Sequence, residues 1–199
     1  MADTGSYDNI ISGLSTIVGG AIDLAPLGTP LPTSIDDFND LDDAFEPFSI
    51  LGDEGITISF NRTVVEEKDE AGRTVNTIVS ERSISVAASF REFLNGKALQ
   101  AVWGADKVTL TAANDEHGNQ IAAHYDGSIV PKCVAVIRIK DGNKRGMFVV
   151  PVFGFTETGE IKLAATESIK PSVVATGYPA ASGDLLHFYG DDGLVTVTP

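Results

Sequence analysis

Short runs in which apolar and polar residues alternate, separated by glycine, aspartate and asparagine, cover most of this chain. Two clear examples are ITISF at residues 56–60 and SISVAASF at residues 83–90. Alternation places every second side chain on the same face of an extended strand. The apolar faces consist of Ile56, Ile58 and Phe60 in the first run and of Ile84, Val86, Ala88 and Phe90 in the second. We predict that these two strands pair with each other.

The residues between these strands, 61–82, continue the strand pattern on both sides of a turn. β-branched residues flank the turn-prone sequence KDEAGR at residues 68–73. We therefore predict one long hairpin that projects beyond the core and has a strongly acidic tip. Since a projecting hairpin buries little surface in its own subunit, we expect another chain to order it. The residues expected to contact that chain are Glu66, Glu67, Asp69, Glu70 and Arg73.

One segment, residues 91–104 (REFLNGKALQAVWG), has the spacing of a helix. Gly104 is placed to end this helix, and Gly96 weakens its first turn. The apolar residues at helical spacing are Leu94, Ala98, Leu99 and Val102. We predict that this is the one helix of the fold and that it lies on the flank of the sheet.

Further strands are predicted after the helix. A second hairpin joins residues 132–140 (KCVAVIRIK) to residues 145–155 (RGMFVVPVFGF), and Pro151 marks an edge or the end of pairing, because proline lacks an amide donor. The remaining β or edge segments are predicted at 107–113, 121–125, 159–179 and 184–190. With about eight to ten strands, the chain is expected to be mainly β, either a β-sandwich or a partly closed barrel.

The segment LAPLGTPLPT at residues 24–33 differs from the rest, because it contains three prolines, one glycine and no charge. It is too rich in proline for a helix and too apolar for an ordinary solvent-exposed loop. We predict that residues 1–33 form an extended N-terminal arm that lies along a neighbouring copy of the chain, and that residues 34–199 form a single β domain. The contact residues expected in the arm are Leu24, Pro26, Leu27, Pro30 and Pro32.

Composition excludes several classes of protein. With 43% hydrophobic residues and a mean hydropathy of +0.08, the 199-residue chain can bury a substantial core. Its 14 Lys and Arg against 28 Asp and Glu give a net charge of −14, the opposite of a protein that grips nucleic acid by its phosphates. No apolar run reaches the roughly 18 residues that span a bilayer, so no membrane insertion is expected.

Candidate chemistry is sparse. The DTGS sequence at residues 3–6 matches an aspartic protease motif, but such enzymes need two copies and this chain has one. The acidic stretches at 36–43 and 190–193 do not fit a calcium-binding EF-hand loop. Cys133 lies in an apolar run and is expected to be a buried small hydrophobe.

The three histidines, His117, His124 and His187, lack the spacing of a metal site. We therefore expect no enzyme, no cofactor and no metal.

The order of segments resembles the major tail proteins (tail tube subunits) of long-tailed bacteriophages, particularly those that infect actinobacteria. The resemblance runs from about residue 22 to residue 178. It consists of LAPLGTPLP, an acidic stretch with LDDAF, the strand entry SILGDEGITIS, the acidic strand RTVVEE, a threonine-rich return strand, a helix that ends in WG, and the later segment VIRIKDGNKRGMFVVPVFGFTETGEIKL.

This resemblance implies a homo-oligomeric ring, normally a hexamer, stacked into a hollow tube that conducts the genome into the host. The implied partners are further copies of the chain and the tape-measure, tail terminator and baseplate proteins, with double-stranded DNA passing through the lumen without specific binding. The implied location is the host cytoplasm before assembly and the tail of the virion afterwards. The acidity then either keeps DNA sliding through the bore or keeps an abundant protein soluble.

A second hypothesis is a non-catalytic β-sandwich that recognises carbohydrate or protein on a virion or a bacterium. The hairpin and the apolar arm would then be its contact surfaces. One Trp and four Tyr argue weakly against a carbohydrate platform, which usually exposes several aromatic rings.

Overall fold

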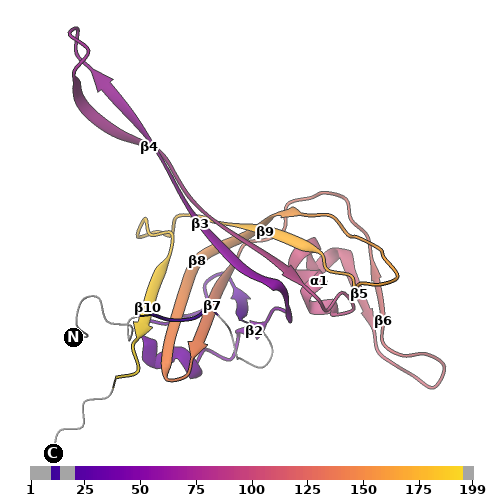
Figure 1. Cartoon of the computed structure of the whole chain (residues 1–199). Helices are drawn as coiled ribbons and strands as arrows, with labels where there is room; N and C mark the ends of the chain where they lie inside the picture. The colour runs from indigo at the N-terminus through magenta and orange to yellow at the C-terminus, as the bar shows by residue number, and fades with distance from the viewer. Residues whose placement is uncertain (1–9, 14–20, 195–199) are drawn as a thin grey trace, which may run out of the picture.

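The structure is a computed structural model that describes residues 10–13 and 21–194. The DTGS sequence lies outside these residues, as do residues 1–9 and 14–20 of the predicted arm. Eight strands form one antiparallel sheet in the order β2-β1-β7-β8-β9-β4-β3, with β10 paired to β8 (Figure 1). The strands of this sheet are β1 (Ile22–Pro26), β2 (Glu46–Pro47), β3 (Leu51–Lys68), β4 (Thr74–Phe90), β7 (Cys133–Asp141), β8 (Lys144–Thr158), β9 (Ser172–Gly177) and β10 (His187–Asp191).

Smaller elements flank this sheet. A two-stranded sheet pairs β5 (Val108–Thr111) with β6 (Gln120–Ala123), beside the helix α1 (Gly96–Trp103). Two short 3-10 helices, η2 (Ile35–Asn39) and η3 (Ala105–Lys107), complete the elements. The prediction of a mainly β protein with one α-helix on its flank is confirmed for the described residues.

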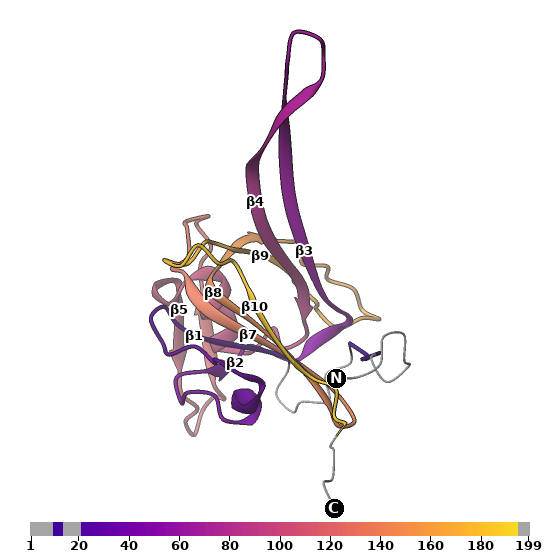
Figure 2. The ribbon, with the colours of Figure 1, turned by 90° about the vertical axis from the view of Figure 1, so that its left-hand side faces the viewer.

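The sheet curls strongly, as Figures 1 and 2 show from two sides, and its concave face carries the larger of two apolar clusters. Ile58 on β3 and Ile137 on β7 line the same hollow, although three other strands separate β3 from β7 in the sheet order. A flat sheet would hold these side chains far apart, so the sheet is a partly closed barrel. The larger cluster, which forms the core, contains Ile22, Ile84, Val86, Phe90, Leu99, Val102, Ala135, Ile137, Val150, Phe153, Val173 and Ala175.

The pairing of the first two predicted strands is confirmed. Ile58 lies opposite Val86, and Phe60 lies opposite Ile84. The β4 side chains Ile84, Val86, Ala88 and Phe90 are buried, whereas Phe60 is 65% exposed. The apolar face of β3 therefore leaves the core at its upper end, where the hairpin begins to project.

A second, smaller cluster covers the outer face of β7 and β8. Ser34 caps η2, because its hydroxyl accepts a hydrogen bond from the backbone N–H of Asp36. In turn, the Asp37 carboxylate accepts a hydrogen bond from the backbone N–H of Ser34. This capping box fixes the turn so that Phe38, 1% exposed, packs on Val136, Met147 and Val149. The acidic sequence at 36–43 is therefore partly a structural turn.

The predicted helix begins five residues later than the sequence pattern indicated. Asn95 is its N-cap, since its side-chain oxygen accepts from the backbone N–H groups of Lys97 and Ala98. Glu92 is held outside the helix, because its carboxylate accepts hydrogen bonds from the backbone N–H of Ile50 (3.0 Å) and from Ser49 (3.1 Å). These contacts tie residues 91–95 to the start of β3, and Leu94 is 86% exposed. Gly104 ends the helix as predicted.

Pro151 lies inside β8, where the strand changes partners. β10 pairs with β8 from Arg145 to Val149, and β9 pairs with it from Phe153 onward. The β7 pairing is also irregular at this level, between Cys133 and Ala135. The missing amide donor of proline thus falls where ladder pairing is interrupted. Downstream, the segment predicted as β at 159–179 forms a strand only over β9.

Gly52 is required for the close packing of β3 on β4. A Cβ atom at this position would lie 2.1 Å from Ser89 Oγ and 3.3 Å from Ser89 Cβ. We expect Gly52→Ala to lower the free energy of unfolding by about 1–3 kcal/mol, the usual range for overpacking a core. Urea titration followed by circular dichroism measures this change.

Ser89→Ala provides the matched control for this site. The hydroxyl of Ser89 is buried without a hydrogen-bond partner in the described structure. Removing it is expected to be neutral or stabilising, and to recover part of the loss when combined with Gly52→Ala. Equal stability of Gly52→Ala and the wild type would show that the Ser89 hydroxyl rotates away from the new methyl group at little cost.

Candidate assembly surfaces

The hairpin of β3 and β4 projects far from the body of the subunit (Figures 1 and 2). The pairing of β4 with β9 begins at Ile84, so in the described structure residues 61–83 pair only within the hairpin. The predicted projection at 61–82 is therefore confirmed. A projecting two-stranded ribbon has little stability of its own in water, which favours a role between chains.

Both faces of the hairpin carry apolar side chains. Val64 lies opposite Val79 on one face, and Val65 lies opposite Ile78 on the other. These residues, with Phe60 and Val75, are between 42% and 65% exposed. Sequence reasoning selected the acidic tip instead and missed this apolar stretch, although the β-branched residues that flank the turn were a visible signal. Exposed apolar surface of this kind is typical of an interface.

The tip is a tightly hydrogen-bonded turn. The Asp69 carboxylate accepts from the backbone N–H groups of Ala71 (3.0 Å) and Arg73 (2.9 Å) and also pairs with the Arg73 guanidinium. The pKa of Asp69 lies below its ordinary value, chiefly because of the hydrogen bond from the backbone N–H of Arg73 and secondly because of the hydrogen bond from the Arg73 side chain. Gly72 takes the left-handed conformation that the turn needs, with φ 78°. Asp69 and Arg73 are thus structural parts of the turn.

The other predicted tip residues lie on the sides of the hairpin. Glu66 accepts a hydrogen bond from the Thr74 hydroxyl (3.0 Å), and Glu67 accepts one from the Asn76 amide (3.0 Å). Both carboxylates are exposed, as is Glu70. Their predicted contact with another chain stays a prediction.

The proline-rich segment is in part a strand of its own subunit. β1 pairs with β7 from Ile22 to Pro26, so Leu24 and Pro26 are bound to this subunit's sheet. Beyond β1 the chain leaves the sheet. Leu27 (55% exposed) and Pro30 are exposed, whereas Pro32 is buried. The contact of this segment with a neighbouring copy also stays a prediction.

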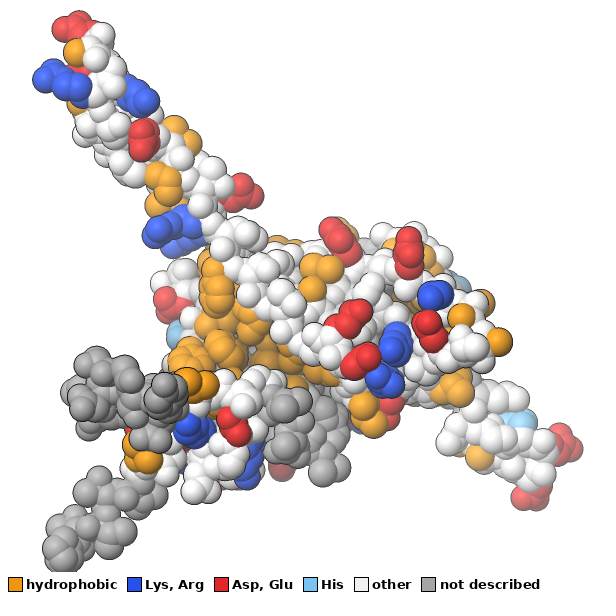
Figure 3. Space-filling model, in the orientation of Figure 1, with side chains coloured by type: hydrophobic (Ala, Val, Ile, Leu, Met, Phe, Trp, Pro, Cys, Tyr) orange, Lys and Arg blue, Asp and Glu red, His pale blue; other side chains and the backbone are white. Residues whose placement is uncertain are grey.

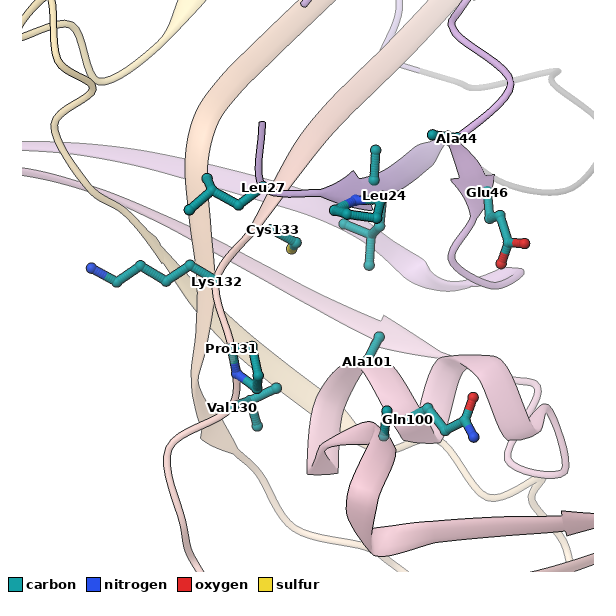
Figure 4. Close-up of a pocket in the computed structure, with 13 residues that line it drawn as sticks. Leu24, Leu27, Ala44, Glu46, Gln100, Ala101, Val130, Pro131, Lys132 and Cys133 are labelled. Atoms are coloured by element: carbon teal, nitrogen blue, oxygen red, sulfur yellow. The ribbon is translucent and has the colours of Figure 1, made fainter. Parts of the chain in front are cut away.

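A groove lies beside Leu24 and Leu27. It holds about 580 Å³ and is lined by β1, α1 and the start of β7 (Figure 4). Cys133 lies in its wall, where burial raises the pKa of the thiol to about 12. This thiol therefore stays protonated at neutral pH. Cys133 is half-buried in the groove wall, whereas the sequence predicted a buried small hydrophobe.

A second apolar hollow lies where the barrel stays open, below the base of the hairpin (Figure 3). Ile56, Ile58 and Phe60 of β3 form one side, and Ile137, Ile139 and Phe148 form the other. β3 is also the last strand of the sheet, so in the described structure its backbone pairs with β4 alone. An open edge beside an apolar surface is a ready site for pairing with another chain.

Three loops expose further large apolar side chains. Leu94 precedes α1, Ile129 precedes β7, and Leu163 lies in the loop after β8, with exposed fractions of 86%, 95% and 77%. Sequence reasoning did not select Ile129 and Leu163, since a single apolar residue in a loop gives no periodic signal. It placed Leu94 on the apolar face of the helix, and this placement is wrong because α1 begins only at Gly96.

The candidate chemical sites of the sequence do not come together. Over residues 10–13 and 21–194, no group of three or more His, Cys, Asp and Glu side chains could hold a metal ion. His117 is used in the β5–β6 turn, where it contacts Asn114 and the carbonyl of Gly118. Asp191 of the second acidic stretch pairs with Arg145. None of the helices in that same part of the chain has the length and apolar character to cross a membrane.

Known proteins were compared with the chain in sequence and in structure. A family model described as phage tail tube protein matches residues 14–198. No curated protein matches the sequence. Among solved structures, the chain is similar to the tail of an empty gene transfer agent particle refined with C6 symmetry, at 15% identity, with 85% of this chain and 95% of that chain covered and a TM-score of 0.47.

Two further structures show a comparable similarity. One is the sheath–tube complex of an extracellular contractile injection system in its extended state, at 10% identity, covering 96% of this chain and all of that chain, with a TM-score of 0.47. The other is the anti-feeding prophage cap, at 13% identity, covering 94% of this chain and 99% of that chain, with a TM-score of 0.43.

Proposed function

The chain belongs to the phage tail tube protein family, and we propose that its copies close into six-membered rings that stack head to tail into a hollow tube. Membership of this family makes the chain a structural subunit of a virion tail. The observation that carries the proposal is the hairpin at 61–82, which exposes apolar side chains on both faces and pairs only with itself in the described structure.

Ring closure accounts for the open edge of the sheet. An exposed strand such as β3 is an aggregation hazard unless another strand or chain covers it. A closed ring covers the same edge on every copy, whereas head-to-tail stacking uses two different surfaces and extends into a filament. We propose that the hairpin acts in stacking, and that Leu24, Pro26, Leu27 and Pro30 contact a neighbouring copy, whereas Pro32 is buried in its own subunit.

The negative charge suits a conduit for DNA. A protein that makes six to ten phosphate contacts changes its DNA affinity by roughly 10³ to 10⁵ over a modest range of salt, so a basic bore would retain the genome. An acidic bore lets double-stranded DNA slide during ejection. We propose that the tube ends at tape-measure, terminator and baseplate proteins, that subunits wait in the host cytoplasm before assembly, and that the chain performs no catalysis.

The proposal is tested by electron microscopy of the purified chain over a range of concentrations and ionic strengths. We expect rings or tubes with a central bore and six subunits in projection. Protein that stays as single particles at every concentration and salt would overturn self-assembly. Retention on a glycan column without assembly would support the binding-module hypothesis instead.

A further inference from the structure

Two arginines face each other at the base of the hairpin. Arg62 on β3 and Arg82 on β4 are direct partners in the strand register, so their side chains leave the same face of the ribbon. Both are exposed. Like charges at such positions repel and destabilise the pairing of the strands. A hairpin that had only to fold would gain from a neutral or oppositely charged residue at either position.

These two arginines also differ from the others in the chain. Each of the other four arginines forms an ion pair with an aspartate: Arg73 with Asp69, Arg91 with Asp53, Arg138 with Asp23, and Arg145 with Asp191. For the residues that the structure describes, no carboxylate lies within 4.0 Å of Arg62 or Arg82. The pair therefore presents two guanidinium groups, the donors best suited to carboxylates, to whatever approaches the hairpin.

The complementary charge is concentrated in the first part of the chain. Residues 1–61 carry 11 of the 28 acidic residues and none of the 14 basic ones. Five of the 11 lie in residues 36–43, which we call the acidic segment. Asp36, Asp37 and Asp42 hydrogen-bond to nearby backbone or hydroxyl groups. The carboxylates of Asp40 and Asp43 are exposed and make no hydrogen bond or ion pair within the described part of the chain.

The hairpin and the acidic segment lie at opposite ends of the subunit. In both views the hairpin leaves one end of the body, and η2, which begins the acidic segment, lies at the other (Figures 1 and 2). In the described structure, Arg62 and Arg82 form no ion pair with the acidic segment of their own subunit. In a head-to-tail stack, however, the hairpin end of one copy faces the opposite end of the next copy.

We propose that Arg62 and Arg82 of one subunit bind the acidic segment of the next subunit along the stack, through the carboxylates of Asp40 and Asp43. This contact rests on the proposed tube, and it assigns two specific surfaces to the stacking step. Charge complementarity of this kind sets the register of a contact and the rate at which it forms. The contact is accordingly expected to weaken with salt, because the Debye length falls from about 10 Å at 0.1 M to about 3 Å at 1 M.

Charge reversal tests the contact. We expect Arg62→Glu/Arg82→Glu to raise the concentration at which tubes sediment by about tenfold or more, equivalent to the loss of one well-formed charged contact. Combining these changes with Asp40→Arg/Asp43→Arg in one chain should restore assembly, since every interface then has exchanged charges. Circular dichroism and thermal unfolding of the unassembled variants show whether each subunit still folds.

A matched control separates the contact from a general effect of charge. Lys97→Glu/Lys162→Glu changes the net charge by the same amount at exposed positions away from the hairpin, and it should assemble like the wild type. If wild type and Arg62→Glu/Arg82→Glu assemble equally, this contact is wrong while the proposed tube stands. If the wild type forms no tubes, the proposed function itself fails.

A phosphate-binding role for the two arginines is the other possible outcome. Binding of wild-type chain to a double-stranded DNA oligonucleotide, measured by fluorescence anisotropy at 0.1 M salt and lost in Arg62→Glu/Arg82→Glu, would overturn the contact between subunits. We expect no binding by either protein, because the chain as a whole is strongly acidic.

Discussion

Replacing Asp23 with alanine is expected to lower the free energy of unfolding by about 3–5 kcal/mol, the usual cost of leaving a buried charge without its partner. Asp23 is 3% exposed, and its Oδ2 accepts a hydrogen bond from Arg138 Nε at 2.8 Å and forms an ion pair with Arg138 Nη2 at 2.8 Å. Arg138 also donates to the carbonyl of Phe38 at 2.9 Å. One pair thus joins β1, β7 and η2. Guanidinium chloride titration measures the loss.

Two further variants show whether the effect comes from the unpaired charge. Asp23→Leu/Arg138→Met replaces both partners by apolar side chains and should unfold close to the wild type, since such replacements are often neutral. Asp53→Ala breaks exposed ion pairs to Arg91 and Lys170 and should change stability far less than Asp23→Ala. Equal losses for Asp23→Ala and the double variant would assign the effect to packing.

The pH dependence of Asp23 has a defined sign. Burial is the largest influence on this carboxyl and raises its pKa above the ordinary value, outweighing the attraction of Arg138. The folded state therefore holds the proton more tightly than the unfolded chain. The stability that this group contributes is complete below its unfolded pKa and falls as the pH rises through its folded pKa. Asp23→Asn lacks this decrease, so the stability difference between the two proteins changes over that range.

The Asp23–Arg138 pair could not be predicted from the sequence. The two residues are 115 positions apart, and nothing in the local pattern around either one indicates the other. Their meeting depends on β1 pairing with β7 in one particular register. The same pairing explains why part of the predicted arm is a strand, since the apolar residues of LAPLGTPLPT that made it unusual also suit a strand that lies between β2 and β7 and packs on a core.

Elements that depend on neighbouring residues alone could be predicted from the sequence. The hairpin could be predicted because β-branched residues extend from both sides of one turn sequence, and all of that evidence lies within 61–82. The helix start could not, because it depends on Glu92 reaching the backbone of Ile50, a contact between segments 42 residues apart. The sequence also indicated the charged tip. It did not indicate that the apolar side chains next to the tip are exposed, because their exposure depends on how far the hairpin extends past β9.

The subunit consists of two parts with different roles, the barrel body and the hairpin. The barrel core and the Asp23–Arg138 pair hold the body together, and they use side chains that are almost completely buried. The hairpin adds exposed apolar and charged surface that contributes little to its own subunit. Changes in the body should therefore alter unfolding, whereas changes in the hairpin should alter assembly.

Deleting residues 66–73 is expected to abolish tube formation and leave a folded, soluble subunit. The deletion joins Val65 to Thr74, so that residues 74–77 become a four-residue loop closed by the existing pair Val65 and Ile78. The removed residues are almost entirely exposed and pair with no strand outside the hairpin in the described structure. Sedimentation and negative-stain microscopy measure assembly, and circular dichroism measures folding.

A loop of similar length elsewhere provides the control. Replacing residues 112–119 with Asn-Gly shortens the β5–β6 connection to a two-residue turn closed by the pair Thr111 and Gln120. This variant should still form tubes, because it leaves the hairpin intact. Normal tubes from the hairpin deletion would remove residues 66–73 from the interface. An unfolded subunit would place the hairpin in the core, since only a segment that stabilises its own chain can unfold it when removed.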